Sequence, residues 1–177
     1  MRIETPVVLY HRLRALFLPG RLTIGGRARI MTGARILFHR GQISIGRRAR
    51  LHTGSMLDAQ KGSITLGERV SLNPYAIIYG LGGVTIGNDV RIAAHAVIVS
   101  FEHNYDDRSK SITDQGHTKR PVVVEDDVWI GSGAKILAGS HVSKGCVIAA
   151  NAVIKGRTEP YGIYGGIPAR LIKYRGE

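Results

Sequence analysis

The stretch VEDDVWIGSGAKILAGSHVSKGCVIAANAVIK, residues 124–155, repeats one short pattern with a period of six residues. An aliphatic residue recurs at Val124, Ile130, Ile136, Val142, Ile148 and Ile154. Four residues after each of them comes a small or slender side chain, at Val128, Ala134, Ser140, Cys146, Ala152 and Thr158. A period of six does not fit an α-helix, whereas regularly placed small residues and glycines indicate short strands that end in turns. The stretch therefore predicts stacked short strands.

The same period extends toward the N-terminus in groups of three. The aliphatic positions are Ile24, Ile30 and Ile36, then Ile45, Leu51 and Leu57, then Leu66, Leu72 and Ile78, then Ile86, Ile92 and Ile98. Two or three extra residues separate neighbouring groups, so each group predicts one coil of three strands with a bulged corner. Stacked coils of this kind form a triangular prism, a solenoid whose axis is filled by aliphatic side chains. Such a core needs few aromatic residues, which make up 6% of the chain.

Two residue types within the repeat have specific expected roles. Cys146 occupies the slender position shared by Ala134 and Ala152, which predicts a core filler rather than a nucleophile. Glycine often follows the aliphatic residue, and here we expect a turn that needs a positive φ angle. These glycines are Gly25, Gly46, Gly67, Gly87 and Gly131.

The composition narrows the classes of partner. The 177 residues are enough for one domain with its own core, and the formal charge of +12 favours an anionic partner such as phosphate, nucleic acid, acidic lipid or an acidic polymer. No helix-turn-helix, zinc-finger or aromatic RNA-binding motif accompanies this charge, so nucleic acid is not the expected partner. Cys146 is the only cysteine, which excludes an intrachain disulfide and fits a reducing cytoplasm.

The N-terminus, MRIETPVVLYHRLRALFLPG, resembles neither a signal peptide nor a membrane span, because Arg12 and Arg14 interrupt its short apolar run. A helix over residues 7–17 would place six residues on one stripe, which His11 and Arg14 would flank. These six are Val8, Leu9, Arg12, Leu13, Leu16 and Phe17. Such a helix either packs on its own domain or lies as an amphipathic segment on a membrane surface.

The repeat is interrupted once, by SFEHNYDDRSKSITDQGHTKRP at residues 100–121. The insertion falls between Ile98 and Val124, at a coil boundary. A rigid scaffold that releases a single long loop is a common way of placing functional residues. We therefore expect the functional chemistry to involve this loop.

The repeat, together with VWIGSGAKILAGSHVSKGCVIAANAVIK and the later GGIPARLIK, resembles the hexapeptide-repeat acyltransferases over roughly residues 20–175. The resemblance is strongest to the maltose and galactoside O-acetyltransferase branch and to bacterial polysaccharide O-acetyltransferases. It implies an all-β, left-handed parallel β-helix with one protruding loop, a short N-terminal helix and a C-terminal tail. It also implies acetyl-CoA as co-substrate and a homotrimer with active sites between subunits. The chain would then comprise an N-terminal amphipathic segment, 1–19, and a β-helix acyltransferase domain, 20–175.

The resemblance also implies a catalytic base. His103, in SFEHNYDD, stands where members of the family carry a histidine at the start of the loop. Imidazole suits this task, because its ordinary pKa near 6.5 lets it accept the proton of an attacking hydroxyl at neutral pH. A carboxylate or a backbone carbonyl would hold its other ring nitrogen, and the sequence leaves the choice open. The nearby carboxylates are Glu102, Asp106, Asp107 and Asp114.

Further positions match the family's substrate contacts. Asn73 matches an asparagine that contacts the acceptor, although it could equally be a structural turn residue. Ser132 and Ala150 match positions at the donor's thioester and pantetheine arm, where a backbone N–H would stabilise an oxyanion. Trp129 matches a wall residue beside that arm, with a subunit contact as the alternative. Three cations match positions at or next to the phosphates of coenzyme A, with a solvated basic tail as the alternative. These are Lys155, Arg170 and Lys173.

The resemblance favours transfer of acetyl to a sugar hydroxyl. The strong positive charge and the amphipathic N-terminus favour a sugar in a cell-surface glycan or its precursor, on the cytoplasmic side of the membrane. An antibiotic or an amino sugar is the alternative acceptor, and a non-catalytic scaffold is the alternative class. The γ-type carbonic anhydrases share the prism but bind zinc through histidines that include a pair five residues apart. No two histidines of this chain have that spacing, so no metal is expected.

Overall fold

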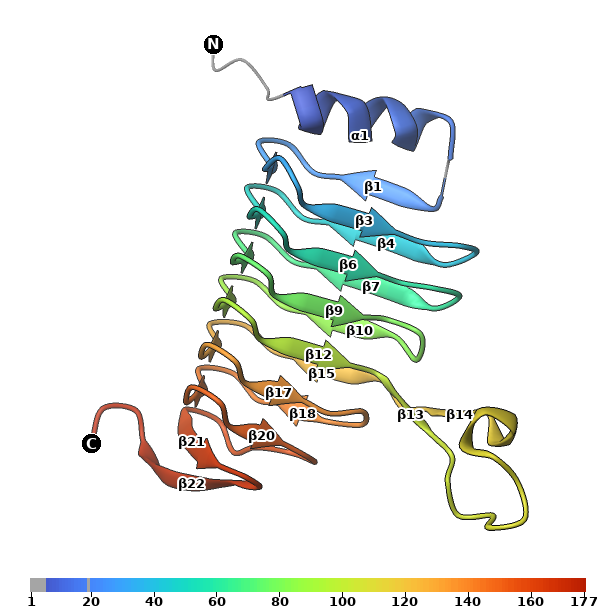
Figure 1. Cartoon of the computed structure of the whole chain (residues 1–177). Helices are drawn as coiled ribbons and strands as arrows, with labels where there is room; N and C mark the ends of the chain where they lie inside the picture. The colour runs from blue at the N-terminus through green and yellow to red at the C-terminus, as the bar shows by residue number, and fades with distance from the viewer. Residues whose placement is uncertain (1–5, 19) are drawn as a thin grey trace.

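The computed structural model describes residues 6–18 and 20–177. Residues 1–5 and 19, which belong to the predicted segment 1–19, lie outside the described residues. The described chain forms a tall prism of stacked coils with a helix across one end and a hairpin projecting from the side (Figure 1). The architecture confirms the predicted all-β fold, a parallel β-helix with one protruding loop and a short N-terminal helix.

Three sheets form the faces of the prism, and each coil contributes one strand to each sheet. The first sheet comprises β1 (Leu22–Ile24), β4 (Gln42–Ile45), β7 (Ser63–Leu66), β10 (Val84–Ile86), β15 (Val122–Val124) and β18 (His141–Val142). The second comprises β2 (Arg29–Ile30), β5 (Arg50–Leu51), β8 (Ser71–Leu72), β11 (Arg91–Ile92), β16 (Trp129–Ile130), β19 (Val147–Ile148), β21 (Gly162–Gly166) and β22 (Ala169–Tyr174). The third comprises β3 (Arg35–Leu37), β6 (Met56–Asp58), β9 (Ile77–Tyr79), β12 (Val97–Val99), β17 (Lys135–Ile136) and β20 (Val153–Ile154).

The register explains the period of six. Parallel pairing aligns Ile30 with Leu51 and Leu51 with Leu72, so aliphatic side chains of successive coils stack in columns. All the predicted aliphatic positions are buried except Ile24, which is half-buried beside the helix end of the prism. Cys146 is fully buried, which confirms its prediction as a core filler.

The glycines that follow the aliphatic residues have a different role from the one predicted. None of Gly25, Gly46, Gly67, Gly87 and Gly131 has a positive φ angle. A Cβ atom on Gly46 would instead lie 2.3 Å from the carbonyl oxygen of Gly67 in the next coil. The positive φ falls two residues later, at Arg27, Arg48 and Arg69. These glycines are therefore required by the close approach of successive coils rather than by the turn.

The C-terminal tail is more ordered than the sequence indicated. β21 and β22 form an antiparallel hairpin, and β21 extends the second sheet by pairing with β19. The chain thus covers the last coil with its own strands, which satisfies backbone groups that the open end of a solenoid would leave unpaired.

Helix α1 (Pro6–Leu16) packs on the first coil, as one of the two interpretations of the N-terminus predicted, but with a different face inward. Val8 and His11 are buried, whereas Leu9, Leu13, Leu16 and Phe17 are exposed. Two guanidinium groups fix this rotation: Arg12 donates to the carbonyl of Gly25, and Arg14 donates to the carbonyl of Ile36. The predicted apolar stripe is therefore wrong as a packing face, because these tertiary hydrogen bonds decide which side of the helix meets the prism.

Burial of His11 makes this packing sensitive to pH. Its Nδ1 atom has no hydrogen-bond partner among the described residues, and burial together with the charge of Arg14 lowers its pKa below the ordinary 6.5. The unfolded chain therefore binds this proton more readily than the folded chain, so stability is lost as the pH falls through about 6.5.

We expect the melting temperature to fall between pH ~7.5 and ~5.5, and to fall less in a His11→Leu variant. Thermal unfolding at both pH values measures the difference, with His39→Leu as the exposed-histidine control. Equal pH dependence in all three proteins would contradict the assignment to His11.

Candidate active site

The interruption of the repeat is a β-hairpin that projects from the prism (Figure 1). The chain leaves the third sheet after β12 and forms β13 (Phe101–His103), then the 3-10 helix η1 (Ile112–Gln115), and returns along β14 (His117–Lys119). The hairpin register places His103 directly opposite His117. Both side chains are exposed, and their ring centroids lie 4.2 Å apart.

The polar contacts of the hairpin do not hold the imidazole of His103 through a carboxylate. Asp107 accepts hydrogen bonds from Ser109 and pairs with Lys110, while Asp114 accepts from Ser111. In the described chain, none of the four nearby carboxylates is bonded to the ring of His103. The described hairpin therefore supplies no carboxylate that would orient the imidazole ring of His103.

Asn104 and Gln115 set the shape of the hairpin beside His103. The side-chain amide of Asn104 donates to the carbonyl of Gln115, and its oxygen accepts from the hydroxyl of Thr118. The amide of Gln115 in turn donates to the carbonyl of Asp107 and accepts from its N–H. Asn104, Gln115 and His117 were not among the site residues predicted from the sequence. The position of His117 directly opposite His103 in the hairpin was the signal that could have revealed His117.

The predicted donor residues Ser132 and Ala150 lie together at one corner of the prism, between the second and third sheets. The N–H of Asn151 donates to the carbonyl of Ser132, which ties the two corner turns. Both residues are exposed, and within the described chain the backbone N–H of neither has a hydrogen-bond acceptor. This corner can therefore offer two unpaired N–H donors to an oxygen atom outside the chain.

Asn73 lies at the same corner, two coils nearer the helix end of the prism. Its side-chain amide donates to the carbonyl of Ile92 at 2.9 Å, alongside its own backbone N–H. That bond ties one coil to the next, as the turn interpretation of Asn73 expects.

The remaining predicted residues are divided between two regions. Trp129 on β16 is 56% exposed, and Arg170 and Lys173 lie exposed on β22 of the same sheet. Lys155 follows β20, at the edge of the third sheet from which the hairpin with His103 also leaves. His103 and the Ser132–Ala150 corner thus lie at opposite edges of the third sheet, and one chain does not bring them together.

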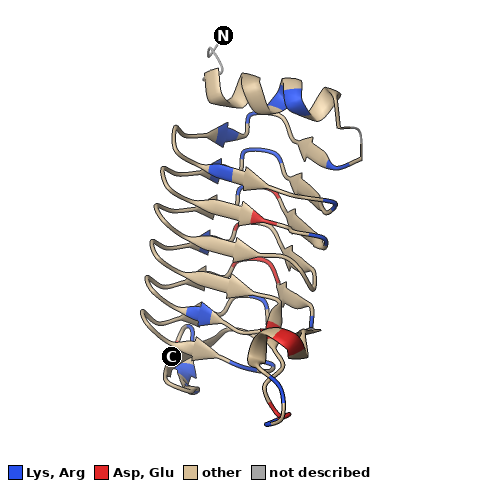
Figure 2. Cartoon of the chain, turned by 45° about the vertical axis from the view of Figure 1, so that its right-hand side comes forward, with Lys and Arg blue, Asp and Glu red and all other residues tan. Residues whose placement is uncertain are grey.

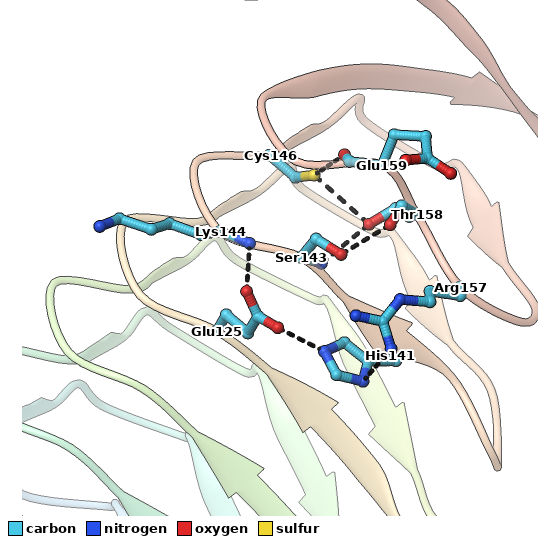
Figure 3. Close-up of polar contacts among 8 residues, drawn as sticks. All are labelled: Glu125, His141, Ser143, Lys144, Cys146, Arg157, Thr158 and Glu159. Carbon is cyan, nitrogen blue, oxygen red and sulfur yellow. Dashed lines mark hydrogen bonds and ion pairs between the residues drawn. The ribbon is translucent and has the colours of Figure 1, made fainter.

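A separate polar cluster fastens the last two coils (Figure 3). Nε2 of His141 lies 2.6 Å from a carboxylate oxygen of Glu125, whose other oxygen accepts from the N–H of Lys144. The hydrogen bond from His141 lowers the pKa of Glu125 below its usual range. Ser143 donates twice to Thr158, from its N–H to the side-chain hydroxyl and from its own hydroxyl to the carbonyl. These contacts join neighbouring coils, which makes the cluster structural.

Within residues 6–18 and 20–177, no three His, Cys, Asp or Glu side chains are grouped so that they could hold a metal ion. None of the helices in the described part of the chain is long and apolar enough to cross a membrane.

The three parallel sheets and the six-residue repeat define a fold class, the hexapeptide-repeat β-helices. Residues 121–156 match the family model "Bacterial transferase hexapeptide (six repeats)", which confirms the resemblance predicted from the repeat.

Two curated relatives match over part of their length. The chain is 38% identical over 92 residues to a probable acetyltransferase of Mycobacterium tuberculosis, which covers 52% of this chain and 31% of that protein. It is 32% identical over 109 residues to the putative lipopolysaccharide biosynthesis O-acetyl transferase WbbJ of Escherichia coli K12, covering 58% of this chain and 56% of WbbJ. The chain thus spans about a third and about half of these relatives.

Solved structures share the fold over nearly the whole chain. A mutant of AntD, an N-acyltransferase from Bacillus cereus in complex with dTDP-4-amino-4,6-dideoxyglucose and coenzyme A, superposes with a TM-score of 0.79 at 23% identity, covering 93% of this chain and 90% of AntD. A hexapeptide-repeat acetyltransferase from Vibrio cholerae in complex with acetyl coenzyme A gives a TM-score of 0.61 at 22% identity, covering 93% of this chain and 77% of that protein. These likenesses establish the fold.

Proposed function

We propose that the protein is an acetyl-CoA-dependent O-acetyltransferase that modifies a sugar hydroxyl in a cell-surface glycan or its precursor. The observation that carries the proposal is His103, exposed on the only long interruption of the repeat. The names of the relatives support it, since one is a probable acetyltransferase and another a putative O-acetyl transferase of lipopolysaccharide biosynthesis. The coenzyme A in the AntD complex supports acetyl-CoA as the acetyl donor.

In the proposed reaction His103 acts as a general base. It accepts the proton of the sugar hydroxyl while the hydroxyl oxygen bonds to the carbonyl carbon of the thioester. The backbone N–H groups of Ser132 and Ala150 stabilise the resulting oxyanion. When the carbon–sulfur bond breaks, His103 returns the proton to the sulfur, so the products are an acetyl ester and free coenzyme A. No covalent intermediate on the protein is required.

The separation of His103 from Ser132 and Ala150 supports a homotrimer as the active form. In a closed ring of three chains, the hairpin edge of one third sheet faces the corner of its neighbour, so each site is completed by two chains. Trp129 then borders the donor's arm, and Arg170, Lys173 and Lys155 meet its phosphates. Asn73 lies on the acceptor side of the same corner. We place the enzyme in the cytoplasm, at the inner face of the membrane, and propose residues 20–175 as its catalytic domain.

The amino sugar in the AntD complex favours a second candidate function. The same base would serve an amine acceptor, and the product would then be an amide rather than an ester.

Donor binding is the first test. We expect acetyl-CoA to raise the melting temperature, because a ligand that binds only the folded state stabilises it. Arg170→Ala should reduce the shift, whereas Lys144→Ala, an exposed cation at another corner, should not. No shift with acetyl-CoA would favour the scaffold interpretation.

Acceptor screening is the second test. Acetyl transfer to free sugars, amino sugars, an antibiotic such as chloramphenicol and lipid-linked glycans is followed by mass spectrometry. Mild alkali removes an acetyl ester and spares an amide, which distinguishes the two candidate functions. An alkali-stable product from amino sugars alone would overturn O-acetylation.

A further inference from the structure

Helix α1 exposes its more apolar face to solvent. Five neighbouring side chains are 49–81% exposed, and we call them the helix patch: Leu9, Tyr10, Leu13, Leu16 and Phe17. At 100° per residue they fall within a sector of roughly 120° on one side of the helix. The opposite side, with Val8 and His11, is buried on the first coil, so the patch faces away from the prism. A contiguous apolar surface of this kind marks an interaction site.

The positive charge of the protein is concentrated at the same end of the prism. Residues 6–57 contain ten arginines and no lysine, aspartate or glutamate, whereas residues 58–177 contain fourteen basic and twelve acidic residues. Figure 2 shows Lys and Arg on the helix, on the coils beneath it and also lower down, whereas Asp and Glu first appear farther down the prism and on the hairpin. Eight of these arginines are exposed on the first two coils, and we call them the arginine collar: Arg21, Arg27, Arg29, Arg35, Arg40, Arg47, Arg48 and Arg50.

Some cations elsewhere on the described surface are balanced by a carboxylate. Farther along the prism, Arg69 pairs with Asp89 and Arg175 pairs with Asp127. Arg29 and Arg50, by contrast, are aligned on adjacent strands with like charges side by side, an arrangement that is unfavourable without a counter-ion. No ion pair within the described chain reaches any arginine of the collar. An anionic partner would supply the missing negative charge.

We propose that the helix patch and the arginine collar bind the surface of a bilayer that contains anionic phospholipid. An interfacial helix that inserts Leu, Phe and Tyr side chains and is surrounded by arginines matches the two components of such a surface, acyl chains and headgroup phosphates. Successive coils are about 4.8 Å apart, so both coils of the collar lie close to the headgroups on the scale of a Debye length of about 8 Å. The prism then stands on the membrane, with the His103 hairpin projecting farther from it.

A nucleic acid would satisfy the arginines but would leave the helix patch in water. The apolar helix patch therefore favours lipid as the partner. Replacing its side chains distinguishes a lipid surface from a nucleic acid. The proposal does not rest on acetyl transfer, because binding to vesicles requires neither substrate.

The test is flotation of the full-length protein with vesicles of phosphatidylcholine mixed with phosphatidylglycerol, compared with phosphatidylcholine alone. We expect binding to the mixed vesicles and much weaker binding to the neutral ones. A Leu13→Gln, Phe17→Gln double variant should bind roughly tenfold less or weaker still, because two inserted apolar side chains are lost without any change of charge. Ile112→Gln is the matched control, since Ile112 is an isolated side chain on the hairpin with 56% exposure.

A second pair of variants tests the collar. Arg29→Gln with Arg50→Gln should weaken binding and reduce its sensitivity to salt, whereas Arg108→Gln with Lys144→Gln, which neutralises exposed cations elsewhere, should leave binding unchanged. All these side chains are exposed, so circular dichroism and the melting temperature should match those of the unmodified protein.

Three results would overturn the proposal. The first is no binding to the mixed vesicles. The second is binding that survives the helix-patch variant, as expected of a general polyanion site such as one for nucleic acid. The third is a protein that does not bind vesicles but whose oligomeric mass changes when Leu13 and Phe17 are replaced. That result would show that a second copy of the chain covers the helix patch.

Discussion

Replacing His103 with alanine is expected to lower kcat by about 10²–10⁴-fold, the range supplied by a positioned general base. The change removes an exposed side chain that makes no hydrogen bond within the described hairpin, so the melting temperature and the oligomeric mass should stay the same. Steady-state acetyl transfer, together with thermal unfolding, measures both effects. Affinity for acetyl-CoA should be nearly unchanged, because the histidine acts on the acceptor's proton.

The matched control is His117→Ala, which removes the neighbouring imidazole from the same hairpin at a ring distance of 4.2 Å. We expect a much smaller loss of kcat than for His103, because His117 acts at most by positioning its neighbour. Equal losses of kcat in the two variants would mean that the imidazoles of His103 and His117 act together in the reaction. Full activity of the His103 variant would remove it as the base and return the mechanism to an open question.

The largest effect on stability is expected for Gly46→Ala. A Cβ atom there would lie 2.3 Å from the carbonyl oxygen of Gly67, and that backbone cannot move without disturbing the next coil. We expect the free energy of unfolding to fall by about 2–3 kcal/mol, as for an overpacked core. Gly26→Ala is the control, because a Cβ atom at Gly26 meets nothing within 4 Å and its φ angle is not positive. Denaturant unfolding that gave the same loss for both variants would contradict the steric explanation.

The arrangement of the proposed site residues could be predicted from the sequence only in part, for physical reasons. The loop that carries His103 could be predicted because it interrupts a strict repeat, whereas the choice of His103 within the loop came from the family resemblance. The bracing by Asn104 and Gln115 could not be predicted, because it depends on how the hairpin closes on itself. The alignment of Ser132 with Ala150 follows from the period, yet their separation from His103 depends on which edge of the sheet each segment leaves.

The N-terminal helix was likewise only partly predictable from the sequence. Its existence followed from helical periodicity, but the buried face was predicted wrongly. The two arginines that hold the helix bond to carbonyls of Gly25 and Ile36, and no pattern within the helix encodes those partners. The exposed helix patch is a consequence of that rotation.

The sequence by itself determined the coils, their number, the columns of aliphatic residues and the point where the loop leaves, because each repeat packs on its neighbours through interactions that recur at a fixed spacing. Only the tertiary structure decided which face of the helix is covered, how closely the repeat glycines approach the next coil, and that His103 lies across the third sheet from Ser132 and Ala150. Those features depend on contacts between segments that differ from one another, and a periodic pattern carries no information about them.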